Sequence, residues 1–380
     1  LEPSFSGGSH AQLSGMSMKM KRDKKGEGAG YGEAAAGKAK SSREAERVAR
    51  EEQKLLRLTT EGPANVDSKD FCGAFAALGI DNSWDHAAFK KGFSISVQHL
   101  SAETVEFDMI GIDPPLANAF RRILIAEVPT VAISRVTIYQ NTSVIHDENL
   151  AHRLGLVPIK FEPNKLEFRS ADADFTDQDS IRFDLHAKCP QGTKKKSVYS
   201  KDLRWKGLSD DQKQQLQEDP PAPVDGDILI AQLAPGQEIT CECYCEKGLG
   251  KEHAKWSPVC TAFYRLHPEI RLTKEIAEED AVDLVACCPV NVFDIEDVPD
   301  VGQRAVVKNA RACTTCRECL ETFPGKEKGL ELGKRKDHFI FSIESVGQVP
   351  APDLFERALA KLKEKCQTAK DVIHQRRQEE

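Results

Sequence analysis

The residues whose types and spacing could do chemistry are cysteines in the last third of the chain. Three of them form a Cys-x-x-Cys-x-x-Cys run, and a fourth precedes a proline upstream. Thiolates at this spacing wrap three corners of an iron–sulfur cluster, and the cysteine of a Cys-Pro step can supply the fourth ligand from a distant segment. Zinc held by the same sulfurs, or free thiols, remain the alternatives. The candidate metal ligands are Cys288, Cys313, Cys316 and Cys319.

A second group of cysteines has a different pattern. Cys241, Cys243 and Cys245 alternate along one predicted strand and share parity with Ile239. Alternate residues of a strand point to one face, and cysteine behaves as a small apolar residue. We therefore interpret this group as part of a core and not as a metal site.

No catalytic signature accompanies the cysteines. The sequence has no glycine-rich phosphate loop, no nucleophile elbow and no His-Glu-x-x-His motif. An acidic run between Asp172 and Asp179 lies in a polar stretch, which favours a solvated loop over a magnesium site. We predict a chain without enzymatic activity of its own.

Composition indicates a folded protein. The chain has 380 residues, 40% of them hydrophobic, which is enough for two or three domains with their own cores. The net charge of −7 argues against a nucleic-acid binder held by a global positive field. No apolar run approaches the roughly 20 residues of a membrane span. No secretory signal is recognisable, so we expect reduced or metal-bound thiols.

The first part of the chain differs from the rest. Residues 1–60 are dominated by Gly, Ala, Ser and Lys and predict a disordered basic arm, with a helix over about 42–58. The basic cluster at residues 19–25 fits either a nuclear address or weak nucleic-acid contact on the one hand, or a solvated tail on the other, equally well. Folded structure is expected from about Phe93.

A helix and a strand are predicted next. Pro114 suits the first helical position, and the spacing that follows places Phe120 and Ile123 on one apolar face. Residues 130–140 alternate as a strand, with a phase slip at Arg135.

A long helix is predicted from about Asp353 towards the C-terminus. Its apolar residues repeat with spacing 4-3-4-3-4, which is typical of a coiled-coil stripe. Such a stripe needs a partner to cover it, and packing within its own chain is the alternative. The stripe consists of Phe355, Leu359, Leu362, Cys366, Ala369 and Ile373.

Four segments, in order, resemble the alpha-like subunits of cellular RNA polymerases. The most specific is "ANAFRRILIAEVP", within residues 107–160. It is followed by "LAPGQEI" at 233–239, "GLGKEHAKWSPV" at 248–259 and "FIFSIESVGQVP" at 339–350. The resemblance covers roughly residues 90–380.

The resemblance implies an α+β fold with a discontinuous alpha-like dimerisation domain. That domain would comprise residues 90–140 and 335–380. A mostly-β middle domain, 141–259, and a small ferredoxin-like insertion, 260–334, would be inserted into it. Archaeal relatives carry such an insertion with a Cys-Pro and a Cys-x-x-Cys-x-x-Cys in this order, which implies one structural cluster on the four cysteines.

The resemblance also implies assembly and not catalysis. The family's larger alpha-like subunit pairs with a smaller one, and the pair forms the platform for the two large catalytic subunits. Contact with DNA would be indirect, through the complex, no membrane would be involved, and the location would be the nucleus, including the nucleolus. The expected dimer interface comprises Phe120, Ile123, Phe355, Leu359, Leu362 and Cys366.

Two eukaryotic branches of the family compete. The polymerase II member carries a cysteine-rich zinc loop soon after "HRLGLVPI", whereas residues 161–188 of this chain contain no cysteine. "FEPNKLEFR" resembles the larger alpha-like subunit shared by RNA polymerases I and III, which we favour. An iron–sulfur electron-transfer protein, or a redox enzyme subunit, would explain the cysteines but not residues 107–160.

Overall fold

The computed structural model describes most of the chain beyond its N-terminal segment. All described residues but Glu52 belong to the unit Lys54–Glu380. Most of the predicted arm, including its basic cluster, lies outside the described residues. The end of the predicted arm is different: Leu55–Leu58 form strand β1, so the helix expected through residue 58 is wrong there. The described residues are 52, 54–64, 85–170, 173–298, 302–322 and 329–379.

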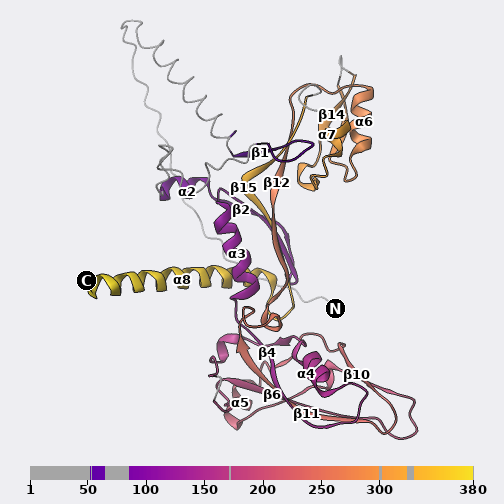
Figure 1. The fold of residues 1–380 in the computed structure, drawn as a ribbon, viewed down its shortest axis with the longest axis vertical. Coiled ribbons are helices and arrows are strands. Elements are labelled where there is room, and N and C mark those ends of the chain that lie inside the picture. The colour runs from indigo at the N-terminus through magenta and orange to yellow at the C-terminus, as the bar shows by residue number, and fades with distance from the viewer. Residues whose placement is uncertain are drawn as a thin grey trace, which may run out of the picture. The chain divides into compact units, whose positions relative to one another are not determined.

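A five-stranded antiparallel sheet is built around the longest strand, β15 (Leu330–Ser345) (Figure 1). One edge of β15 pairs with β12 (Val259–Leu272) along its whole length. The other edge pairs first with β1 and then with β3 (Thr104–Ile110). Strand β2 (Ser94–Leu100) pairs with β3 and ends the sheet on that side. Phe339, Phe341 and Ile343 face one core, as their alternation predicts.

Two helices cover this core. Helix α3 (Pro114–Ala126) begins with proline, as predicted, and buries Phe120 and Ile123. Helix α8 (Ala351–Glu379) contacts α3 and β3. The short helix α2 (His86–Gly92) precedes β2, with Asp85 accepting hydrogen bonds from the first amides. The core of this sheet-and-helix layer is contiguous.

A second antiparallel sheet has the strand order β4-β11-β6-β8. Its core face includes Cys241, Cys243 and Cys245 on β11, each at most 2% exposed, which confirms their predicted role. The ladder between β4 and β11 shifts between Ile133 and Arg135, which is the bulge that the phase slip predicts. Its strands are β4 (Thr130–Asn141), β6 (Ser180–Lys188), β8 (Arg204–Lys206) and β11 (Glu238–Gly248).

Short elements close this second core. Helix α4 (Asp147–Gly155) ends at Gly155 and buries Leu150 and Leu154. The others are α5 (Asp210–Gln215), the strand pair β7 (Lys196–Tyr199) and β10 (Leu229–Leu233), and the pair β5 (Ile159–Lys160) and β9 (Ala222–Pro223).

A third core lies within the insertion between β12 and β15. It combines α6 (Glu279–Cys287), the hairpin β13 (Phe293–Val298) and β14 (Gly302–Val307), and α7 (Glu318–Thr322).

The fold is of the predicted α+β class. Two strands, however, pair in a sheet other than the one that the expected domain bounds would give them. Strand β4 pairs in the second sheet, although residues 130–140 are expected in the dimerisation domain. Strand β12 pairs in the first sheet, although residues 260–272 are expected in the insertion. No described helix is long and apolar enough to cross a membrane.

Candidate assembly surface and cysteine site

The first half of α8 packs on its own chain. Ala351, Leu354 and Ala358 are fully buried, and they define the inner face of the helix. Phe355 lies beside this face, with its ring 4.8 Å from Phe107 and 5.5 Å from Phe120 between centroids. The predicted stripe is therefore partly used within the chain, which was the alternative interpretation.

The second half of α8 is uncovered. Every residue from 363 to 378 is exposed. Of the six residues expected at a dimer interface, Phe120 and Ile123 are buried in the core, and Phe355 and Leu362 are partly buried against it. The two that remain accessible are Leu359, 43% exposed, and Cys366.

The edge strand β2 adds an apolar surface that sequence reasoning missed. Ile95, Val97 and Leu100 are 44%, 56% and 63% exposed. They pair with Met109, Phe107 and Val105 of β3, all of which are buried, and the bulge after Val97 brings Leu100 back to the same face. These three residues thus extend the core face of the sheet beyond the part that the helices cover. The alternating apolar residues in "FSISVQHL" were the available signal, but alternation alone does not tell a covered strand from an uncovered one.

Exposed apolar residues on β2 and α8 form what we call the assembly surface. Exposed apolar side chains that gather on one element can mark a site of interaction. Its members are Ile95, Val97, Leu100, Leu359 and Ile373.

The predicted metal ligands line one small hollow. Cys288 follows α6, Cys313 and Cys316 lie in the loop before α7, and Cys319 lies on α7. The hollow has a volume of about 10 Å³, which is room for about one water. No three His, Cys, Asp or Glu side chains among the described residues are placed to hold a single metal ion. The four thiols are thus neighbours, without the tight convergence of a mononuclear site.

Backbone amides point at two of these sulfurs. The Thr315 N–H donates to Cys313 Sγ at 3.3 Å, and the Val292 N–H donates to Cys288 Sγ at 3.4 Å. Thr315 itself has φ 62°, in the left-handed region that only a few per cent of non-glycine residues adopt. Such amide-to-sulfur bonds stabilise negative charge on sulfur, and they suit thiolates that bind a metal.

Two of these thiols, Cys313 and Cys319, are disposed to stay protonated when nothing is bound. Burial raises the pKa of Cys313 and raises that of Cys319 to about 12. A cation would have to displace these protons, as metals do at cysteine sites. Cys287 does not line the hollow, and its thiol donates to the Leu284 carbonyl at 3.2 Å.

A buried ionic network ties the cysteine loop to the first sheet. Arg311, two residues before Cys313, forms an ion pair with Asp108 on β3. The other carboxylate oxygen of Asp108 lies 3.1 Å from His338 Nε2 on β15, and Arg265 on β12 donates to the Arg311 carbonyl at 2.8 Å. Residues of β3 and β12 therefore contact Arg311 directly, and His338 of β15 contacts Asp108. Sequence reasoning missed this network because Arg311 and Asp108 are 203 positions apart.

Comparison with known proteins places these features in a family. A family model described as the RNA polymerase Rpb3/Rpb11 dimerisation domain matches residues 106–366. The DNA-directed RNA polymerases I and III subunit of Dictyostelium discoideum is 42% identical over 323 residues, which cover 83% of this chain and 92% of that protein. Its human counterpart is 41% identical over 327 residues, covering 82% and 93%.

A relative from the other branch is less similar. The DNA-directed RNA polymerases II, IV and V subunit 3 of Arabidopsis thaliana is 33% identical over 307 residues, which cover 74% of this chain and 91% of that protein. The comparisons confirm the favoured branch, and they support the polymerase interpretation over the electron-transfer alternative. The chain belongs to the alpha-like family of RNA polymerase subunits, which is defined by the Rpb3/Rpb11 dimerisation domain.

Proposed function

We propose that this chain is a non-catalytic assembly subunit of DNA-directed RNA polymerases I and III. It pairs with a smaller alpha-like subunit, and the pair forms the platform on which the two large catalytic subunits dock. The observation that carries this proposal is the 42% identity, over 83% of the chain, to a subunit named for both polymerases. The nucleus, including the nucleolus, is the corresponding location, and contact with DNA is indirect.

The assembly surface supports pairing. Its β2 residues extend a sheet face whose neighbouring part is already a core, so a second sheet-and-helix layer would continue that core across the interface. Each large apolar side chain fully buried there contributes about 1.5–3 kcal/mol. Several such residues together contribute enough free energy to stabilise a permanent heterodimer.

Pairing is tested by co-expression with the smaller alpha-like subunit and gel filtration. The wild-type chain should elute as a one-to-one complex. Val97→Asp should abolish the complex because it places a charge in the shared core. Gln98→Asp is the matched control, since it introduces the same charge on the same strand at the bulged residue. Equal yields of complex from both variants would place the interface elsewhere.

The absence of catalysis is part of the proposal. Nucleotide incorporation by the purified chain alone, persisting through gel filtration, would contradict it.

For the cysteine site, we propose that Cys288, Cys313, Cys316 and Cys319 hold one iron–sulfur cluster. The shared hollow and the amide-to-sulfur bonds support this donor set. Zinc held by the same four sulfurs is the lesser alternative, and metal analysis of the purified protein distinguishes the two. When bound, the cluster would cross-link α6 to the α7 loop and stabilise the insertion.

Anaerobic purification tests the cysteine proposal. Protein with a cluster should absorb broadly near about 400 nm, where cysteine-ligated clusters absorb. The band and the iron should both be lost in Cys316→Ala and retained in Cys260→Ala, a control that removes an exposed cysteine outside the site. Colourless, iron-free protein after anaerobic reconstitution would leave only free thiols.

A further inference from the structure

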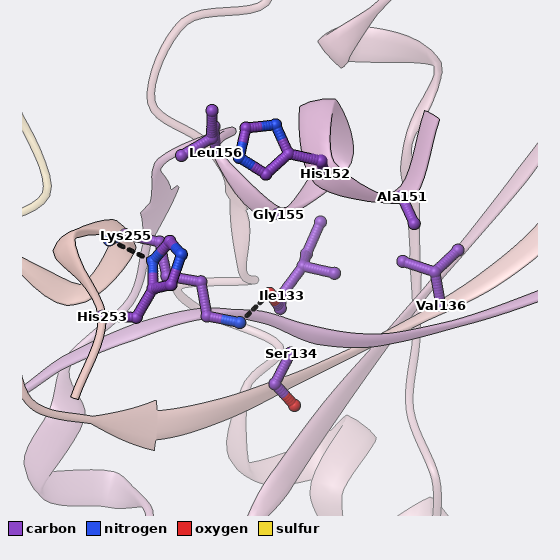
Figure 2. Close-up of a pocket in the computed structure, with 9 residues that line it drawn as sticks. All are labelled: Ile133, Ser134, Val136, Ala151, His152, Gly155, Leu156, His253 and Lys255. Atoms are coloured by element: carbon purple, nitrogen blue, oxygen red, sulfur yellow. Dashed lines mark hydrogen bonds between the residues drawn. The ribbon is translucent and has the colours of Figure 1, made fainter. Parts of the chain in front are cut away.

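A second hollow, outside the assembly surface and the cysteine site, has no role in either proposal above. It has a volume of about 230 Å³ and lies between α4, β4 and the loop before β12 (Figure 2). Pockets for drug-sized ligands have volumes of about 300–1,000 Å³, so this hollow suits a single side chain better. Its lining residues are Ile133, Ser134, Val136, Ala151, His152, Gly155, Leu156, His253 and Lys255.

The ionisable residues of this lining are two histidines and one lysine, His152, His253 and Lys255, and none of them carries a negative charge. Figure 2 shows His152 on one side of the hollow and His253 with Lys255 on the other. No Asp or Glu is among the described residues that line it. The lining therefore complements an anionic group.

The polar groups of the loop are held in place. The Lys255 N–H donates to His253 Nδ1 at 3.1 Å. Because Nδ1 is the acceptor there, the neutral ring carries its proton on Nε2, the nitrogen on the other side of the ring. The Lys255 ammonium donates to the Ile133 carbonyl at 3.0 Å and lies 4.3 Å from the centroid of the Trp256 ring. One of its three N–H donors is used in that bond.

Close packing fixes the loop that carries these donors. A Cβ atom at Gly250 would lie 2.3 Å from the Ile125 carbonyl oxygen, and one at Gly248 would lie 2.4 Å from the Trp256 ring. Thr130 Oγ1 donates to the Trp256 carbonyl at 2.7 Å. The donors are therefore preorganised, which lowers the entropic cost of binding.

The hollow also has an apolar rim. Leu156, just after α4, is 51% exposed. In the last turn of α4, the carbonyls of His152 and Arg153 already accept a hydrogen bond from the Leu156 N–H. Burial lowers the pKa of Lys255, the charge of Glu246 offsets part of that loss, and a further carboxylate beside the ammonium would offset more of it.

We propose that this hollow receives the carboxylate of an Asp or Glu side chain from a protein that assembles with this chain. The two walls come from residues 107–160 and 248–259, the segments that carry the resemblance to alpha-like subunits. The acidic residue would be flanked by an apolar one that packs on Leu156. This inference rests on the proposed assembly role and names a contact separate from the assembly surface.

Charge at the rim tests the inference in the intact complex. Tagged full-length chain with Leu156→Asp, Leu156→Asn or no change is expressed in its own cells, and the co-purified subunits are quantified over a salt series. Leu156→Asp should lower recovery of one subunit roughly ten-fold, because like charges brought together across an interface cost several kcal/mol. Leu156→Asn, of similar size to Asp but uncharged, removes only the apolar contact and should lower recovery much less than Leu156→Asp does. Equal recovery in all three, or equal loss in Asp and Asn, overturns the inference.

A photo-cross-linker identifies the occupant. The variant Leu156→p-benzoylphenylalanine should cross-link to one protein, within a few residues of an Asp or Glu of that protein. The control, Val144→p-benzoylphenylalanine, carries the cross-linker at an 81% exposed position outside the hollow and should not cross-link to it. A cross-link to nucleic acid, or to a segment without an acidic residue, contradicts the inference. If the proposed function itself were wrong, the result would be different, because the wild-type chain would then bring down no polymerase subunit at all.

Discussion

At the scale of single residues, the contact between Asp108 and Arg311 does most to join the cysteine loop to the first sheet. Asp108 is 7% exposed and pairs with both Arg311 and His338. Arg311 Nη2 is buried without a hydrogen-bond partner among the described residues and lies 3.8 Å from Glu106, so Asp108 is the carboxylate that hydrogen-bonds the guanidinium. Removing one member of such a pair leaves an uncompensated buried charge.

Asp108→Ala should therefore lower the free energy of unfolding by about 3 kcal/mol. Asp294→Ala removes an exposed carboxylate from an ion pair with Lys308 and should change stability little. Urea denaturation followed by circular dichroism measures both. If the two variants unfold at the same urea concentration, the network contributes nothing to stability.

His267 gives the same region a pH dependence. Burial, followed by the charge of the stacked His338, lowers the pKa of His267 below its ordinary value of 6.5. Arg311 and Arg265 also lower it, whereas Asp108 raises it. The unfolded chain thus binds a proton at higher pH than the folded chain, so stability is full above 6.5 and is lost as pH falls through the lowered pKa.

Thermal unfolding between pH 7 and pH 5 tests this sign. The melting temperature of the wild-type protein should fall further on acidification than that of His267→Gln, which cannot take up the proton. Parallel curves for the two proteins would assign the acid sensitivity to other groups.

At the scale of elements, local signals were reliable and long-range pairings were not. Proline at the start of α3, the bulge near Arg135 and the buried parity of Cys243 were all predictable, because each depends on neighbours within a few residues. The pairing of β1 with β15 joins residues some 280 positions apart, and its four residues carry no distinctive pattern. The same limit applies to the network of Arg311 and to the hollow beside Lys255.

In helix α8, the apolar stripe predicted from the sequence differs from the face that packs in the core. The 4-3-4 spacing predicted an apolar stripe, but the fully buried face is a neighbouring one that includes Leu354 and Ala358. Small alanines allow the close approach to α3 and the sheet, and a stripe defined by large residues overlooks them. The sequence alone could not say which of the two faces packs inside the chain.

The two faces of α8 should respond differently to mutation. Leu354→Ala should cost about 2–5 kcal/mol of folding stability, as for other buried leucines. Leu359→Asp with Ile373→Asp should leave the isolated chain stable and weaken pairing, because both positions are about half exposed. Ala360→Asp, one residue on and about 100° around the helix, is the matched control. Thermal unfolding and gel filtration with the smaller subunit separate the effects, and a fold that collapses in the Leu359 double variant would contradict the assignment.

At the scale of the whole molecule, three cores are linked by shared strands and by specific side-chain contacts. Gln348, between β15 and α8, donates to the Val131 and Ile159 carbonyls at 2.9 and 3.1 Å and so joins the first core to the second. Asp108 and Arg311 join the first core to the third. The dimerisation sheet thus carries both other parts, which fits a subunit whose work is to hold surfaces in fixed positions.

The central claim is that this chain assembles into two polymerases, and affinity purification from its own cells tests it most directly. A tagged chain, recovered under native conditions and analysed by quantitative mass spectrometry, should bring down the smaller alpha-like subunit together with the large catalytic subunits of both RNA polymerase I and RNA polymerase III. The large subunits of RNA polymerase II should be absent. Recovery of polymerase II subunits, or of no polymerase subunit, would contradict the account.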